Sequence, residues 1–212
     1  MRRRDLLYSP LLAALPLGPA LLLSSQTWAQ CGAATPLLHR RIARERLAHM
    51  SLWNDRDHAW QRPQPMESLA AGPAVQILHL WADWCLPCVQ EMPLLQRLST
   101  RLRERCGSRA RLSCVAEITT DADMDRFLSS HGQAMPPGPY FQDTAERFSR
   151  DLLPFLPQGR LSLPLNLVID GDHVIRYAVI GSLADASPEL LPLCQRLVEL
   201  ASTPPSTPSK KP

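Results

Sequence analysis

The hydrophobic pattern of the chain alternates between short apolar runs and helical repeats from about residue 75 onward. The run 75–81 is apolar on both faces, which is typical of a central strand covered by helices. The stretch after it keeps helical spacing on one face through Cys88, Met92, Leu95, Leu98 and Leu102. Pro87 suits the first turn of such a helix, Pro93 is expected to bend it, and Gly107 to end it.

The elements that follow come in an order that indicates the fold class. We expect a strand at 111–118, a short helix at about 121–128, a weak strand at 140–141, a helix at 144–153, a hairpin of strands 165–169 and 174–180, and a last helix from 187. Alternating strands and helices followed by a hairpin predict an α/β fold. Its central mixed sheet should have helices on both faces.

The segments outside this pattern have other compositions. Apolar residues at helical spacing among arginines predict one helix over 35–50, and the Trp-, Pro- and Asp-rich stretch 51–73 is expected to be irregular. The tail 202–212 has no apolar residue to bury and should be disordered. We therefore divide the mature chain into an N-terminal extension at 30–71, a folded domain at 72–201 and the tail.

Residues 1–29 have the pattern of a signal peptide. A run of three arginines precedes the apolar stretch 11–23, and Thr27-Trp28-Ala29 has the small residues of a cleavage site. The apolar stretch is shorter than the ~20 residues of a spanning helix, although an uncleaved anchor stays open if 6–23 is tilted. We expect an exported, periplasmic protein, soluble or anchored at its N-terminus, in a compartment where disulfides persist.

The formal net charge of +3 is small, and its excess is confined to the two ends of the chain. Without Arg2, Arg3, Arg4, Lys210 and Lys211, the chain has 18 basic and 20 acidic residues. This balance argues against nucleic-acid binding by the folded part.

Cys85 and Cys88 stand at the expected start of the helix that follows the strand 75–81. Thiol–disulfide exchange needs a thiolate nucleophile and a second thiol that resolves the mixed disulfide. A helix N-terminus favours negative charge and lowers a thiol pKa, so we assign Cys85 as the nucleophile and Cys88 as the resolving thiol. Leu86 and Pro87, between them, should set the redox poise.

Other uses of the cysteines need other features. A zinc site needs two more ligands, usually a second closely spaced pair, and the six histidines are scattered. Among the remaining cysteines, Cys106 and Cys114 flank one helix–strand connection and are the first candidates for a disulfide. Cys194 lies on an apolar helix face and could be a buried thiol, and pairings with Cys31 stay open.

The sequence Trp81-Ala82-Asp83-Trp84-Cys85-Leu86-Pro87-Cys88 resembles the active-site signature of the thioredoxin superfamily. Its continuation, Val89-Gln90-Glu91-Met92-Pro93, is similar to that of the exported TlpA- and ResA-like thiol–disulfide oxidoreductases. The resemblance covers about 72–201 and is strongest over 75–98. It implies a thioredoxin-like fold of three layers.

The resemblance also implies a substrate groove beside the cysteines. Pro164 matches a cis-proline of the family that faces the active site, although the family commonly has Thr or Val where this chain has Leu163. These two residues, with Trp84, Leu86 and Pro87, are the candidates for the groove.

Two further residues are candidates for proton transfer. Glu91 matches a family glutamate thought to assist that step, and its alternative is a solvated helix carboxylate. Thioredoxins place a buried Asp six residues before the first cysteine, where this chain has His79. A buried histidine near Cys88 could exchange a proton near neutral pH, or it could be a core histidine bonded to backbone.

These features predict an exported oxidoreductase that reduces disulfides of periplasmic proteins. The resemblance implies substrates such as apocytochrome c and a membrane electron donor. No metal or small-molecule cofactor is expected, because the cysteines carry the electrons. Two alternatives stay open: an oxidase or isomerase that makes disulfides, and a non-catalytic module that binds copper through its thiols.

Overall fold

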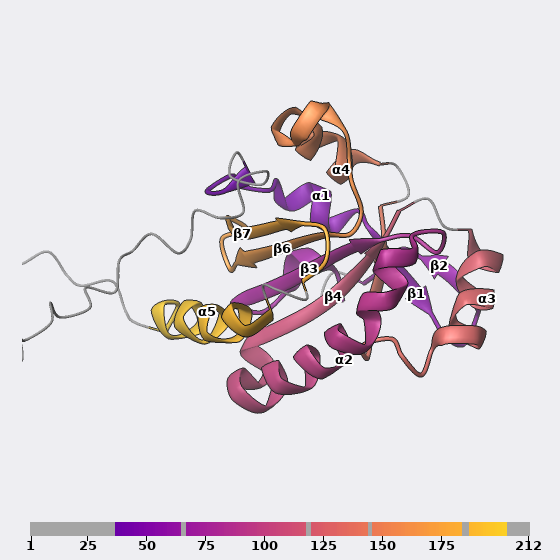
Figure 1. Cartoon of the computed structure of the whole chain (residues 1–212), viewed down its shortest axis with the longest axis horizontal. Helices are drawn as coiled ribbons and strands as arrows, with labels where there is room; N and C mark the ends of the chain where they lie inside the picture. Colours follow the sequence, from indigo (N-terminus) through magenta and orange to yellow (C-terminus); the bar gives the residue numbers. More distant parts are fainter. Residues whose placement is uncertain (1–36, 65–66, 118–119, 144–145, 184–186, 203–212) are drawn as a thin grey trace, which may run out of the picture. The chain divides into compact units, whose positions relative to one another are not determined.

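The computed structural model describes residues 37–64, 67–117, 120–143, 146–183 and 187–202 (Figure 1). Its strands are β1 (Ser51–Asn54), β2 (Ala59–Gln61), β3 (Val75–Trp81), β4 (Ala110–Ala116), β5 (Tyr140–Gln142), β6 (Leu165–Asp170) and β7 (Ile175–Ile180). Its α-helices are α1 (Arg44–Ala48), α2 (Leu86–Cys106), α3 (Asp121–His131), α4 (Arg147–Leu152) and α5 (Ser187–Leu200).

The strand β3 lies in the interior of the described sheet. The strand order is β2-β1-β5-β4-β3-β6-β7, and β3 pairs in parallel with β4 and antiparallel with β6 (Figure 1). All seven residues of β3 are buried, as its continuous apolar run predicted. The predicted mixed sheet is therefore confirmed.

The two faces of the sheet carry separate apolar clusters. On the first, which we call the α2 face, Ile77 and Trp81 pack with side chains of α2, α3 and α5. On the second, which we call the α4 face, Leu78 and Leu80 pack with side chains of α1 and α4. Each large apolar side chain buried in this way contributes roughly 1.5–3 kcal/mol. The result is the expected arrangement of three layers.

The start of α2 places the cysteine pair at the carboxyl end of β3. Cys85 is the N-cap of α2, and Pro87 lies in the first turn, where its missing N–H is harmless. The helix continues across Pro93 and ends at Cys106, before Gly107 with a φ of 59°. Glycine adopts this left-handed conformation without a steric cost, so the predicted helix end is confirmed.

The helix predicted over 35–50 is much shorter in the structure, because α1 has five residues. The residues before α1 bond to the edge of the sheet instead. The N–H of His39 donates to the carbonyl of Ile175 at 2.8 Å, and Arg41 forms a β-bridge with Val174. This pairing uses the backbone groups that a longer helix would have needed.

The prediction that 51–73 is irregular was wrong over residues 51–61. β1 and β2 form an antiparallel hairpin, and β1 also pairs with β5. The Asn54 side chain accepts a hydrogen bond from the N–H of Arg56 at 2.8 Å and stabilises the turn. Trp53 and Trp60 face each other across the hairpin with ring centroids 5.3 Å apart. Strands of four and three residues are too short to show a clear alternation.

Several predictions lie outside the described residues. These are the signal peptide at 1–29, Cys31, the tail from 203 onward, and 144–145 of the helix predicted over 144–153. Within the part of the chain that the structure describes, no helix is both long and apolar enough to cross a membrane.

Candidate active site

Cys85 and Cys88 form a disulfide at the N-terminus of α2, with their Cα atoms 5.3 Å apart. The Cys85 Sγ accepts a hydrogen bond from the backbone N–H of Cys88 at 3.3 Å, in the manner of an N-cap side chain. Cys88 is fully buried, whereas Cys85 keeps 5% of its surface exposed. Because the first N–H groups of a helix carry partial positive charge, this position stabilises a thiolate on Cys85.

An apolar surface adjoins Cys85. Trp84 and Leu86 are 69% and 65% exposed, and Pro87 is exposed as well. Leu163 packs against the apolar cluster that contains both cysteines, and the Leu163–Pro164 peptide bond is cis, as the resemblance implied. Large apolar side chains left in water are typical of a surface that contacts another protein.

Glu91 and His79 meet in the core on the α2 face of the sheet. They are 3% and 0% exposed, and the Oε2 of Glu91 lies 3.8 Å from the Nδ1 of His79. The N–H of Leu183 donates to the Oε1 of Glu91. Among the described residues, neither the Oε2 of Glu91 nor the Nε2 of His79 has a hydrogen-bond partner. Glu91 is therefore not the solvated carboxylate of the alternative interpretation.

Burial determines the protonation of this pair. Desolvation lowers the pKa of His79 to about 4, and a hydrogen bond to Asn166 opposes this shift only in part. Desolvation raises the pKa of Glu91, and the hydrogen bond from the N–H of Leu183 opposes this shift. His79 is therefore neutral at neutral pH, and Glu91 keeps its proton to higher pH than a solvated glutamate.

Asn166 is a site residue that the sequence analysis missed. It is buried on β6 in register with His79, and its Oδ1 lies 2.8 Å from the Nδ1 of His79. The partner of this histidine is thus a side chain and not the backbone. The signal that could have identified Asn166 is a single amide within the apolar run 165–169, because a buried amide needs partners.

A second buried polar site, which contains two acids, lies on the α4 face, and the sequence did not predict it either. Glu117 and Asp143 follow β4 and β5, Ser149 belongs to α4, and each is at most 5% exposed. The Oγ of Ser149 lies 2.7 and 2.8 Å from the two carboxyl oxygens of Glu117 and 2.9 Å from Oδ2 of Asp143. Burial raises the pKa of Glu117 to about 7, opposed by the bond from Ser149.

The suggested disulfide between Cys106 and Cys114 does not form. Both are free buried thiols, as is Cys194. Cys114 lies four residues into β4, which carries it roughly 13 Å along the strand from the connection to α2. A disulfide needs Cα atoms within about 7 Å, so flanking the same connection was a poor guide. Burial raises the pKa of all three thiols.

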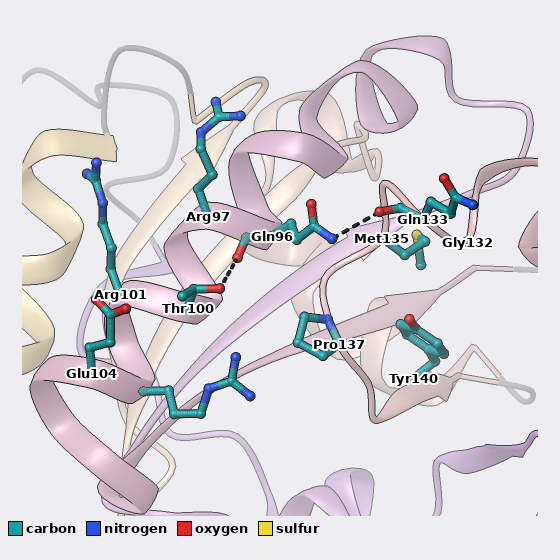
Figure 2. Close-up of a pocket in the computed structure, with 11 residues that line it drawn as sticks. Gln96, Arg97, Thr100, Arg101, Glu104, Gly132, Gln133, Met135, Pro137 and Tyr140 are labelled. Atoms are coloured by element: carbon teal, nitrogen blue, oxygen red, sulfur yellow. Dashed lines mark hydrogen bonds between the residues drawn. The ribbon is translucent and has the colours of Figure 1, made fainter.

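A surface hollow of about 690 Å³ lies between α2 and the loop that precedes β5 (Figure 2). Its walls include Gln96, Arg97 and Thr100 on one side and Gln133 and Pro137 on the other. Gln96 donates to the carbonyl of Gln133 at 3.0 Å, which joins the two sides. The hollow includes neither cysteine of the disulfide, so it is separate from the candidate site.

Within the described residues, no group of three or more His, Cys, Asp or Glu side chains comes together as a metal ion would require.

The comparisons with known proteins concern the fold. No protein-family model matches the chain. A putative protein disulfide isomerase from Bacteroides thetaiotaomicron is similar, with a TM-score of 0.54 and 13% identity over 76% of this chain and 90% of that one. A putative thiol:disulfide interchange protein DsbE from Chlorobium tepidum has a TM-score of 0.50 and 18% identity over 62% of this chain and 85% of that one. DsbF from MTB has a TM-score of 0.50 and 16% identity over 72% of this chain and 96% of that one.

At these identities the likeness shows the fold alone. Two of these structures have names that refer to disulfide chemistry, and DsbF is described in mixed oxidized and reduced forms. The chain therefore has the thioredoxin-like fold seen in thiol–disulfide oxidoreductases, with a Cys-x-x-Cys disulfide at the start of α2.

Proposed function

We propose that the protein is an exported thiol–disulfide oxidoreductase that reduces disulfides of periplasmic proteins through Cys85 and Cys88. The observation that carries the proposal is the position of this disulfide, at the N-terminus of α2 beside two exposed apolar side chains, Trp84 and Leu86. A protein substrate can dock on these side chains and meet Cys85, while Cys88 stays inside.

In the reducing direction, the dithiol form of the pair reacts. The Cys85 thiolate attacks one sulfur of the substrate disulfide, forms a mixed disulfide and releases a substrate thiolate, which takes up a proton. Cys88 then loses its proton and attacks the Sγ of Cys85. The Cys85–Cys88 disulfide forms, and the second substrate thiolate leaves. Two electrons pass to the substrate, and a membrane electron donor later returns two to the pair.

The second step needs an internal proton acceptor, because Cys88 is fully buried. Glu91 lies on α2 within one turn of Cys88, and its Oε2 has no hydrogen-bond partner in the described residues. Its raised pKa brings the carboxylate closer to the pKa of a thiol, which favours proton transfer. His79 offers a second buried base at Nε2. We assign the acid–base role to these two residues.

The compartment and the partners are part of the same proposal. The signal-peptide pattern of 1–29 supports export, and the likeness to TlpA- and ResA-like proteins supports substrates such as apocytochrome c and a donor in the membrane. The cysteines carry the electrons, so the exchange itself requires no metal or small-molecule cofactor.

Disulfide formation or isomerisation is the second candidate, because one similar structure is described as a putative protein disulfide isomerase. The reduction potential of the Cys85/Cys88 pair separates the directions. A value near about −270 mV supports a reductant, and one near about −120 mV supports an oxidant. Copper that co-purifies with the reduced protein at one equivalent would instead support the metal-binding alternative.

The test of the proposed function is trapping by Cys88→Ala in the full chain. This variant can form the mixed disulfide on Cys85 but cannot resolve it, so we expect covalent adducts with exported proteins that a reductant releases. Cys85→Ala is the matched control and should trap none. The proposal fails if Cys88→Ala yields no adduct, or if both variants yield the same ones.

A further inference from the structure

Asn166 connects three strands of the sheet on its α2 face. It lies on β6, in register with His79 on β3 and with Val179 on β7. Its Oδ1 lies 2.8 Å from the Nδ1 of His79, and its Nδ2 donates to the carbonyl of Gly181 at 3.3 Å. The amide is 2% exposed, so water does not compete for these bonds.

The bond to Gly181 determines how the amide of Asn166 faces. A backbone carbonyl can only accept, so the amide group that points at it must be the NH₂. The Oδ1 therefore faces His79. Because this oxygen can also only accept, the Nδ1 of His79 must carry a hydrogen.

This network fixes the tautomer of His79. Burial keeps the ring neutral, with a pKa lowered to about 4, so the hydrogen on Nδ1 leaves a lone pair on Nε2. The opposite tautomer would set the lone pairs of Nδ1 and Oδ1 against each other. It would also bury an N–H on Nε2, an atom without a partner in the described residues.

We propose that Asn166 is a positioning residue of the exchange site, which holds His79 so that Nε2 is a proton acceptor. The role in exchange rests on the proposed function, whereas the tautomer does not. When Nε2 takes the proton that leaves Cys88, His79 becomes a cation. Its Nδ1–H keeps the bond to Asn166, and the Oε2 of Glu91, 3.8 Å from Nδ1, stabilises the positive charge.

The tautomer can be read directly by nitrogen NMR of ¹⁵N-histidine-labelled protein. Comparison with His79→Gln identifies the signals of His79 among those of the six histidines. We expect a protonated Nδ1 and an unprotonated Nε2 in the wild type. Asn166→Leu keeps the volume without the hydrogen bonds and should lose this signature. Gln76→Leu, which removes another buried amide of the sheet, should keep it.

The rate of mixed-disulfide resolution tests the consequence for exchange. Asn166→Leu should slow the attack of Cys88 roughly tenfold or more. Asn166→Asp should keep the bond to Nδ1 and shift the pH dependence of the rate to higher pH, because the added negative charge raises the pKa of His79.

Three results would overturn the proposal. They are a hydrogen on Nε2 in the wild type, an unchanged His79 spectrum in Asn166→Leu, and a changed spectrum with an unchanged rate. Trapping by Cys88→Ala does not depend on His79. The proposed function and the role of Asn166 can therefore fail separately.

Discussion

The two faces of the sheet each bury an acidic site, and the sites differ in how their polar atoms are satisfied. On the α4 face, every carboxyl oxygen of Glu117 and Asp143 contacts Ser149 or a backbone N–H. On the α2 face, Glu91 and His79 each keep one atom without a partner in the described residues. An unsatisfied buried polar atom costs about 1–3 kcal/mol. We therefore interpret the first site as structural and the second as functional.

The two acids of the α4-face site differ in charge. The Ser149 hydroxyl lies within hydrogen-bond distance of both Glu117 and Asp143. Asp143 also accepts the N–H groups of Arg147 and Ser149 at 3.1 and 2.9 Å, which favours its anion. Burial raises the pKa of Glu117 to about 7, so Glu117 is the acid that keeps its proton to higher pH. These hydrogen bonds tie the ends of β4 and β5 to α4.

The largest difference should appear in exchange kinetics. Glu91→Gln removes one of the two proposed acid–base groups and the negative charge beside His79, and it should slow resolution of the mixed disulfide about 100-fold at pH 7. The wild-type rate should rise with pH as Glu91 ionises, above the usual glutamate range because its pKa is raised, and the variant should lose this rise. Rapid-mixing measurement of substrate thiol release gives both rates. Glu117→Gln is the control, and a similar slowing in it would erase the contrast between the faces.

The next effect is on stability. The pKa of Glu117 is about 7 in the folded chain against the 4.5 of an ordinary glutamate, so folding favours its protonated form. The stability that protonated Glu117 contributes to the fold is fully present below about pH 4.5 and is lost as pH rises through 7. Glu117→Gln mimics the protonated acid. The difference in free energy of unfolding between this variant and the wild type should therefore grow from near zero at pH 4 to on the order of 3 kcal/mol at pH 8. Urea unfolding at both pH values measures this difference, and a difference that did not change with pH would contradict the raised pKa of Glu117.

A smaller loss is expected for Ser149→Ala. Removing the hydroxyl leaves both carboxyls without their shared partner and should lower the free energy of unfolding by about 2 kcal/mol, with exchange unchanged. Ser113→Ala is a matched control, because the Oγ of Ser113 is buried without a partner in the described residues. The idea of a bonded structural site fails if the two serine variants lose the same stability.

The smallest effect should come from Cys114→Ala, on the row of side chains that includes His79. Loss of the buried sulfur should cost about 1 kcal/mol and leave the exchange rate unchanged. In the reduced native protein, burial should protect Cys114 from alkylation at pH 8 while Cys85 reacts. Mass spectrometry of alkylated protein checks this. Fast labelling of Cys114 would show that the core of the α2 face opens.

The unit of β3 and α2 could be predicted because its signals are local. A continuous apolar run, helical spacing and a Cys-x-x-Cys pair lie within about thirty residues. The cis bond before Pro164 came from the family resemblance, and the second one, Gly138–Pro139, was not predicted.

What the sequence did not reveal depends on distant partners. Asn166 meets His79 across 87 positions, and Ser149 meets Glu117 across 32. Neither pair leaves a pattern along the chain. The short strands β1 and β2 were missed for a related reason, since the pairing of β1 with β2 and with β5 outweighs weak local preferences.

The N-terminal extension touches both outer sides of the thioredoxin-like sheet. Its strand β1 pairs with β5, and its residues 39–42 bond to residues 173–175, at the start of β7. Sheet edges expose N–H and C=O groups on which another chain can add a strand. With the extension in place, the outer strand β2 is only three residues long. The extension therefore covers the outer side of β5, and a form that lacked it would expose β5 as an open edge for self-association.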